Sequence, residues 1–157
     1  MIYIGIDPGK GGGVAVIDEQ GVAGALVVTT KMPDTPADLL AWLMLRGGPR
    51  NVRAVLERVH AGVFGKGKRG RMGVSSAFTF GRGVGHIEMA LLAAGIPYDE
   101  VAPATWQGAL GCRSGGDKNV TKRRAQALFP HLKVTHATAD CLLLAEYCRR
   151  LHSSEGP

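Results

Sequence analysis

Apolar and polar residues alternate along the chain with two different periods, which together predict an α/β fold. Short apolar runs rich in β-branched residues predict strands at residues 2–7, 14–18, 22–30, 52–57 and 98–101. Apolar residues three or four apart predict helices at residues 37–45, 75–94, 118–129 and 136–151, with a further short helix from Pro103. We find no internal repeat and no linker, and therefore expect one domain over residues 1–157.

The order of these elements predicts how the strands pair. The first three strands follow one another through short connections, which favours an antiparallel meander. A helix precedes the fourth strand and another follows it, so the fourth strand is expected beside the first and parallel to it. The first strand is apolar at nearly every position and is expected to be buried on both faces. The prediction is a mixed five-stranded sheet, with three antiparallel and then two parallel strands, flanked by helices.

Three carboxylates stand out by their positions in this pattern. Asp7 ends the first strand and Glu57 ends the fourth, so parallel neighbours would place both at the carboxyl edge of the sheet. Asp140 lies near the start of the last helix, on its predicted apolar face, and His136 lies on that face one turn earlier. The predicted face comprises Asp140, Leu144, Tyr147, Cys148 and Leu151. Two simpler roles stay open: Glu57 as a surface residue and Asp140 as a helix cap.

Carboxylates gathered in this way would repel one another unless a cation lies between them. Oxygen ligands suit Mg²⁺ or Mn²⁺ better than Zn²⁺. Two such ions, ~3.5–4 Å apart, can activate a water molecule and stabilise the leaving oxygen of a phosphodiester. The pattern therefore predicts a metal-dependent nuclease with Asp7, Glu57 and Asp140 as metal ligands.

The charge is distributed unevenly along the chain, which carries a net charge of +6. Residues 59–87 contain no carboxylate, and residues 112–133 contain a single one, Asp117. The basic residues in these two segments are Lys66, Lys68, Arg69, Arg71, Arg82, Arg113, Lys118, Lys122, Arg123, Arg124 and Lys133. Such segments point to a polyanion, most simply nucleic acid, although a solvated basic surface is the alternative.

Several classes of protein are excluded by what the sequence lacks. No apolar run reaches the ~18 residues of a membrane helix, and the N-terminus does not have the pattern of a signal peptide. Three scattered cysteines, Cys112, Cys141 and Cys148, indicate a reducing compartment such as the cytoplasm, with the last two in packing roles. Neither a membrane partner nor a small-molecule cofactor is expected.

Some residues allow a structural and a functional interpretation. Gly81, Gly83 and Gly85 interrupt the predicted helix 75–94 and would permit close approach of another helix or of a phosphate backbone. Ser75 or Ser76 is expected to cap that helix. The two tryptophans, at positions 42 and 106, are more typical of core than of base-stacking residues.

The ordered motifs resemble the RuvC family of Holliday junction resolvases, in the ribonuclease H-like superfamily. The matching segments are Gly5-Ile6-Asp7-Pro8-Gly9, Val55-Leu56-Glu57 and Ala139-Asp140-Cys141-Leu142-Leu143-Leu144-Ala145. Similarity in Ser76-Ala77-Phe78, Pro103-Ala104-Thr105-Trp106 and Lys118 extends the resemblance over nearly the whole chain.

The resemblance implies a ribonuclease H-like fold and a homodimer that cuts four-way DNA junctions symmetrically in recombination and repair. It implies two Mg²⁺ or Mn²⁺ ions per site, held by Asp7, Glu57 and Asp140, with Lys118 contacting phosphate. The expected catalytic set also includes His136. The expected DNA contacts are His60, Phe64, Lys66, Lys68, Arg69, Arg71, Arg82, Lys118, Lys122 and Arg123.

The sequence also departs from the family pattern. The family has an acidic residue or a histidine three residues before the last aspartate, where this chain has Ala137, so His136 or Asp117 would have to supply the fourth ligand. An aromatic residue expected three positions after the glutamate is replaced by His60, with Phe64 further on. These departures favour a divergent, phage-type member.

Three other functions compete with a junction resolvase. One is a nuclease of the same fold acting more broadly on flaps, branched DNA or RNA–DNA hybrids. Another is a junction-binding protein without catalysis. The third is an actin- or sugar-kinase-type phosphate enzyme, which also begins with a strand, an aspartate and a Gly-rich hairpin. That class requires a second phosphate motif and a second domain, and neither is found in the sequence.

Overall fold

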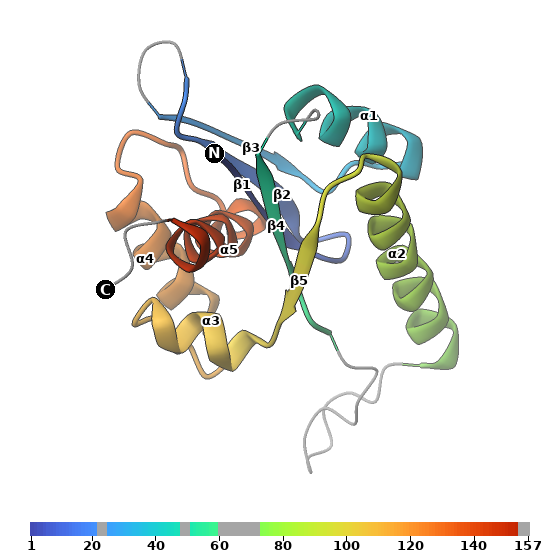
Figure 1. Ribbon diagram of the computed structural model, residues 1–157. Helices are drawn as coiled ribbons and strands as arrows, with labels where there is room; N and C mark the ends of the chain where they lie inside the picture. The colour runs from blue at the N-terminus through green and yellow to red at the C-terminus, as the bar shows by residue number, and fades with distance from the viewer. Residues whose placement is uncertain (22–24, 48–50, 60–72, 154–157) are drawn as a thin grey trace.

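A mixed five-stranded sheet forms the centre of the computed structural model, which describes residues 1–21, 25–47, 51–59 and 73–153 (Figure 1). The strands are β1 (Ile2–Asp7), β2 (Gly13–Asp18), β3 (Leu26–Lys31), β4 (Val52–Glu57) and β5 (Tyr98–Val101). Their order is β3-β2-β1-β4-β5. The pairs among β1, β2 and β3 are antiparallel, whereas β4 lies parallel to β1 and β5 parallel to β4. The predicted sheet is confirmed.

Helices cover both faces of the sheet (Figure 1). They are α1 (Pro36–Gly47), α2 (Val74–Ala93), α3 (Pro103–Ala109), α4 (Lys118–Leu128) and α5 (His136–His152). The alternation of β1 divides the core, because Ile2, Ile4 and Ile6 pack with α1 and α2 while Tyr3 packs with α3, α4 and α5. The first strand is thus buried on both faces, as predicted.

The last helix, α5, lies across the middle of the sheet and contacts β1, β2, β3 and β4. Residues 141–146 are all buried, because the sheet covers one side of the helix and α3 and α4 cover the other. The predicted single apolar face is therefore wrong in its extent, and Leu151 is 52% exposed. A reciprocal hydrogen-bond pair between Thr135 and Thr138 caps the helix, so Asp140 is not its cap.

Several element boundaries differ from the prediction, and two of the differences have a clear structural reason. Helix α2 begins at Val74 after an N-cap glycine, Gly73, without a side-chain cap, so the predicted caps Ser75 and Ser76 lie inside its first turn. Strand β3 begins at Leu26 rather than at residue 22, since its register pairs Leu26 with Asp18, the last residue of β2; residues 22–24 lie outside the described ranges.

The three cysteines are free and buried, which agrees with the packing roles predicted for Cys141 and Cys148. In the described part of the chain, every helix falls short of the length and hydrophobicity that a membrane span requires.

Candidate active site

The carboxyl edge of the sheet brings Asp7 and Glu57 together. Strands β1 and β4 run in parallel register with Ile6 beside Leu56, and each carboxylate is the next residue of its strand. The two carboxyls are near enough that each affects the pKa of the other. The interpretation of Glu57 as an isolated surface residue is therefore wrong.

Burial and crowding change the acidity of this pair. Burial raises the pKa of Asp7 to about 8 from its ordinary value of 3.8, and the nearby charges of Glu57 and Asp140 add to the effect. The pKa of Glu57 is also raised, mainly by burial and further by Asp140. Lys118, the first residue of α4, opposes the increase at both carboxyls. Asp7 is therefore protonated near neutral pH, and a bound cation would relieve the repulsion among the three carboxylates.

Trp106 holds Glu57 in place from α3. Its indole Nε1–H donates a hydrogen bond to Glu57 Oε1 at 3.0 Å, and the ring is fully buried among residues of α3, α4 and α5. This donor favours the carboxylate form of Glu57 and so counteracts the increase in its pKa. Trp106 was expected only as a core residue. The residue type could have indicated this second role, since the N–H of a buried tryptophan needs a hydrogen-bond acceptor.

Asp140 approaches the pair from the N-terminal part of α5. Its Oδ1 atom is buried and has no hydrogen-bond partner among the residues that the structure describes, and its charge acts on both Asp7 and Glu57. A buried carboxylate oxygen without a donor costs several kcal/mol unless a cation reaches it. Asp140 thus faces the same shortage of positive charge as the pair on the sheet.

These oxygens fit a hard divalent cation such as Mg²⁺ or Mn²⁺ in type and charge. In the ranges that the structure describes, no group of three or more His, Cys, Asp or Glu side chains is arranged so that it could hold a metal ion. With a pKa of about 8, the Asp7 carboxyl carries a proton near neutral pH, so binding of a cation there requires release of that proton.

The other two candidate ligands lie elsewhere. His136 is the first residue of α5 and is exposed; it is not among the groups that shift the pKa of Asp7 or Glu57. Asp117 is the N-cap of α4, where its side chain accepts a hydrogen bond from the Asn119 amide at 2.9 Å. The structure therefore gives Asp117 a capping role.

The loop after Asp7 is built to pass close to it. A Cβ atom added to Gly12 would lie 2.9 Å from Asp7 Cγ, so only glycine fits there without a shift. Gly9 adopts a φ of 106°, which side chains rarely tolerate, and its carbonyl accepts a hydrogen bond from Gly12. The loop is thus a tight hairpin turn packed against the candidate site.

The residues expected to contact DNA fall into three groups. Lys118, Lys122 and Arg123 lie in the first two turns of α4, and Lys118 is near enough to influence the carboxylates. Arg82 lies on α2, beside a cleft described below. His60, Phe64, Lys66, Lys68, Arg69 and Arg71 lie outside the described residues.

Comparison with known proteins identifies the fold. No protein-family model matches the sequence, and a search of curated proteins finds no match. A solved structure of Thermus thermophilus RuvC is 20% identical, with a TM-score of 0.59, covering 94% of this chain and 92% of that one. A second, T. thermophilus RuvC in complex with a Holliday junction substrate, is 18% identical, with a TM-score of 0.60 and 98% of each chain covered. The chain therefore has the RuvC-like variant of the ribonuclease H-like fold along nearly its whole length, as the motifs predicted.

Proposed function

We propose that this protein is a metal-dependent endonuclease that resolves four-way DNA junctions. The observation that carries the proposal is the set of carboxylates at one edge of the sheet, where burial and crowding raise the pKa of Asp7 and of Glu57 and where, among the described residues, a buried oxygen of Asp140 has no partner. The likeness to a RuvC structure in complex with a Holliday junction substrate supports the choice of substrate.

In this proposal Asp7, Glu57 and Asp140 hold Mg²⁺ or Mn²⁺, two ions per site. Bound ions would supply Lewis acidity and an activated water. The chain itself contributes orientation and charge: Trp106 fixes Glu57, and Lys118 adds positive charge at the edge where the phosphate arrives. The exposed position of His136 leaves it free to approach DNA or a metal ligand set from the end of α5.

The test is cleavage of a synthetic four-way junction by the purified protein with Mg²⁺, compared with no metal. Linear duplex, flap and RNA–DNA hybrid substrates are run beside it. Cleavage of the junction alone supports a resolvase, and equal cleavage of flaps or hybrids would replace it with a broader nuclease. Tight junction binding without cutting in either Mg²⁺ or Mn²⁺ would identify a non-catalytic junction-binding protein.

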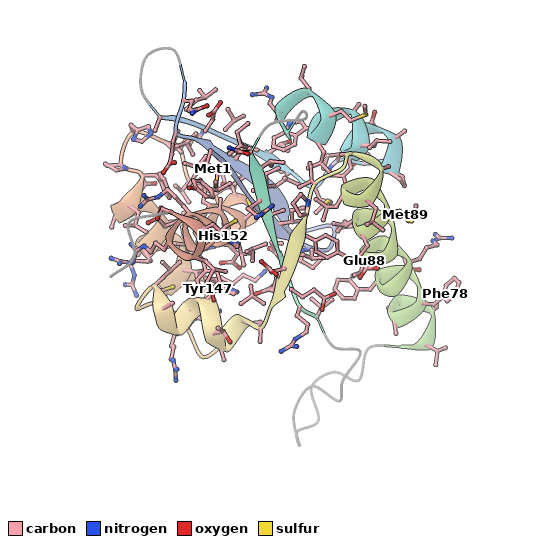
Figure 2. All side chains as sticks on the ribbon, viewed as in Figure 1. Met1, Phe78, Glu88, Met89, Tyr147 and His152 are labelled. Atoms are coloured by element: carbon pink, nitrogen blue, oxygen red, sulfur yellow. The ribbon has the colours of Figure 1, made fainter. Side chains whose placement is uncertain are left out.

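The exposed face of α2 supports a homodimer. Val74, Phe78, Met89 and Leu92 are 89%, 70%, 61% and 63% exposed, and they recur at helical spacing along one side. Phe78 and Met89 point away from the sheet in Figure 2. Gly81 and Gly85 lie on the same side, and a Cβ at either would meet no atom within 4 Å. Within the described ranges, no other element uses the close approach that these glycines allow.

We propose that α2 packs against α2 of a second copy about a two-fold axis. Two sites related in this way suit symmetric cleavage of two strands. The Phe78→Glu variant is expected to raise the dimer dissociation constant about 100-fold, because a carboxylate would be buried within the apolar face. Sedimentation equilibrium measures this constant. Leu151→Glu is the control, because Leu151 is an exposed apolar residue of α5. An unchanged constant for Phe78→Glu would disprove the α2 interface.

The bond from Trp106 gives a further prediction. Trp106→Phe keeps an aromatic ring in the core but removes the donor to Glu57, so metal affinity is expected to fall about 10- to 100-fold, as for other residues that orient a ligand. Calorimetric titration with Mn²⁺ measures the affinity, and circular dichroism checks the fold. Trp42→Phe is the matched control, since Trp42 packs on the other face of the sheet.

The control variant also gives a spectroscopic readout. Because the chain has two tryptophans, Trp106 is the only one left in Trp42→Phe, and its fluorescence should respond to metal binding at Glu57. Unaltered Mn²⁺ affinity in Trp106→Phe, together with a silent Trp106 signal, would show that the indole does not position a ligand.

A further inference from the structure

A cleft of about 840 Å³ lies beside the candidate active site, between the β1–β2 hairpin, the loop that leads into α1, and the first half of α2. Gly9 and Lys10, which follow Asp7 by two and three residues, form part of its wall. The ring of Phe80 packs on the hairpin, with a carbon 3.2 Å from where a Cβ of Gly9 would be. The cleft therefore adjoins the hairpin that begins at Asp7.

The walls of the cleft combine an apolar floor with a polar, cationic rim. Leu39 and Ile87 are buried and Phe80 is half-buried, whereas the polar lining residues are exposed. The polar lining residues are Lys10, Asp34, Thr35, Ser75, Ser76, Thr79, Arg82 and His86. Lys10 and Arg82 outnumber the single acid, Asp34, so the rim is positive even with His86 neutral.

Arg82, which lines the rim of the cleft, contacts the ring of Phe78. Its guanidinium carbon lies 5.9 Å from the centre of the Phe78 ring, one turn earlier on α2. This cation–π contact restrains the side chain without neutralising its charge. Lys10 lines the cleft from the β1–β2 hairpin, so positive charge is present on two separate elements.

The size and lining of the cleft identify the class of ligand. The volume falls in the range of pockets that enclose small molecules, which suits a nucleotide and is too small for a duplex. Cations bind phosphates, and an aromatic ring over an apolar floor stacks bases whose faces are free. The combination fits a short stretch of unpaired DNA.

We propose that the cleft binds one or two unpaired nucleotides of the strand that enters the active site. Lys10 and Arg82 contact the phosphates, and the Phe80 ring stacks on a base. The proposal rests on the proposed nuclease function, since it takes the carboxylate edge as the place of cleavage. It adds a substrate preference, because branch points that expose unpaired nucleotides fill the cleft and fully paired ones do not.

The test measures DNA binding in an Asp7→Asn background, in which cleavage is switched off. Fluorescence anisotropy at several salt concentrations compares a paired four-way junction, the same junction with two unpaired thymidines at the branch, and a linear duplex. The junction with unpaired thymidines is expected to bind about tenfold more tightly than the paired one. Phe80→Leu, which keeps an apolar side chain against Gly9, should remove that difference.

The charged residues are tested separately. Lys10→Ala and Arg82→Ala should each reduce the slope of log affinity against log salt by about 0.7 for the junction with unpaired thymidines, the value for one phosphate contact on a single strand. Arg53→Ala is the control, because Arg53 is exposed near the start of β4, at the opposite end of the sheet.

The outcomes separate the two proposals. If the wild-type protein cuts junctions, but Phe80→Leu and Lys10→Ala bind both junctions as the parent does, the cleft proposal is wrong and the nuclease proposal stands. A parent protein that binds none of the three DNAs overturns both. Loss of the tenfold preference in Phe80→Leu, with an unchanged Arg53→Ala, supports the cleft.

Discussion

The Asp7→Asn variant is expected to lose junction cleavage by about 10³-fold or more, and at the same time to unfold at a higher temperature than the wild type at pH 8. The loss of cleavage follows from the central position of Asp7, whose charge would bind metal beside Glu57 and Asp140. Removal of a ligand that stabilises several kcal/mol of transition-state charge corresponds to this factor.

The stability gain has the opposite origin. The pKa of Asp7 is about 8 in the folded protein and 3.8 in the unfolded chain, so between these pH values the folded state holds a proton that the unfolded state has released. The free energy of unfolding therefore falls as the pH rises from about 4 to 8. Asparagine cannot ionise, so the variant avoids a cost on the order of a few kcal/mol that is largest at and above pH 8.

Thermal unfolding without metal, measured from pH 5 to pH 8.5, checks whether the stability of the wild type falls as the pH rises. The melting temperature of the wild type should fall across this range relative to that of Asp7→Asn, and Mg²⁺ should raise it in the wild type only. Asp18→Asn is the matched control, since Asp18 lies at the other end of the hairpin, where its side chain accepts a bond from the Gln20 amide. If the melting temperatures of the wild type and of Asp7→Asn changed with pH in parallel, that result would contradict the raised pKa of Asp7.

The proton on Asp7 also predicts how metal affinity depends on pH. Because a cation displaces the proton held by Asp7, binding of Mg²⁺ should release protons and should tighten as the pH rises toward 8. The carboxylate edge is thus unfavourable for the folded protein by itself and favourable for a cation.

The Gly5→Ala variant is expected to be destabilised by about 3 kcal/mol or more, at the upper end of the cost of overpacking a core. Gly5 lies in the middle of β1 under α5. A Cβ there would lie 2.7 Å from the carbonyl carbon of Leu144, and closer still to Ala145 N and Cys141 O. All three are helix backbone atoms, so no side chain can rotate away, and α5 would have to move off the sheet.

Urea denaturation followed by circular dichroism measures this effect, and the midpoint should fall without a change in slope. Gly11→Ala in the nearby hairpin is the control, because a Cβ there meets no atom within 4 Å and should change stability by about 0.5 kcal/mol at most. Equal midpoints for the two variants would mean that α5 does not approach β1 as closely as the structure has it. Asp140 lies on α5, so separation of α5 from β1 should also lower the affinity of the proposed metal site.

Much of the candidate site follows from local sequence patterns. The strands ending in Asp7 and Glu57 were predicted with their observed ends, since short runs of β-branched residues bounded by glycine and proline are a local signal. The crossover rule then placed the two carboxylates side by side, because parallel neighbours end at the same edge. Local sequence signals were therefore enough to predict that Asp7 and Glu57 lie at the carboxyl edge of the sheet.

Contacts between segments far apart in the sequence were decided only by the tertiary structure. Trp106 lies 49 residues from Glu57, and no pattern along the chain specifies that its N–H donates to that carboxylate. The buried oxygen of Asp140 and the all-round burial of α5 arise because the sheet and two helices enclose that helix, which the spacing of its apolar residues cannot encode. The sequence by itself determined which residues stand at the edge of the sheet. Only the tertiary structure decided how far the pKa values of those residues are raised and which neighbours hold them, because burial and hydrogen bonding depend on packing in three dimensions.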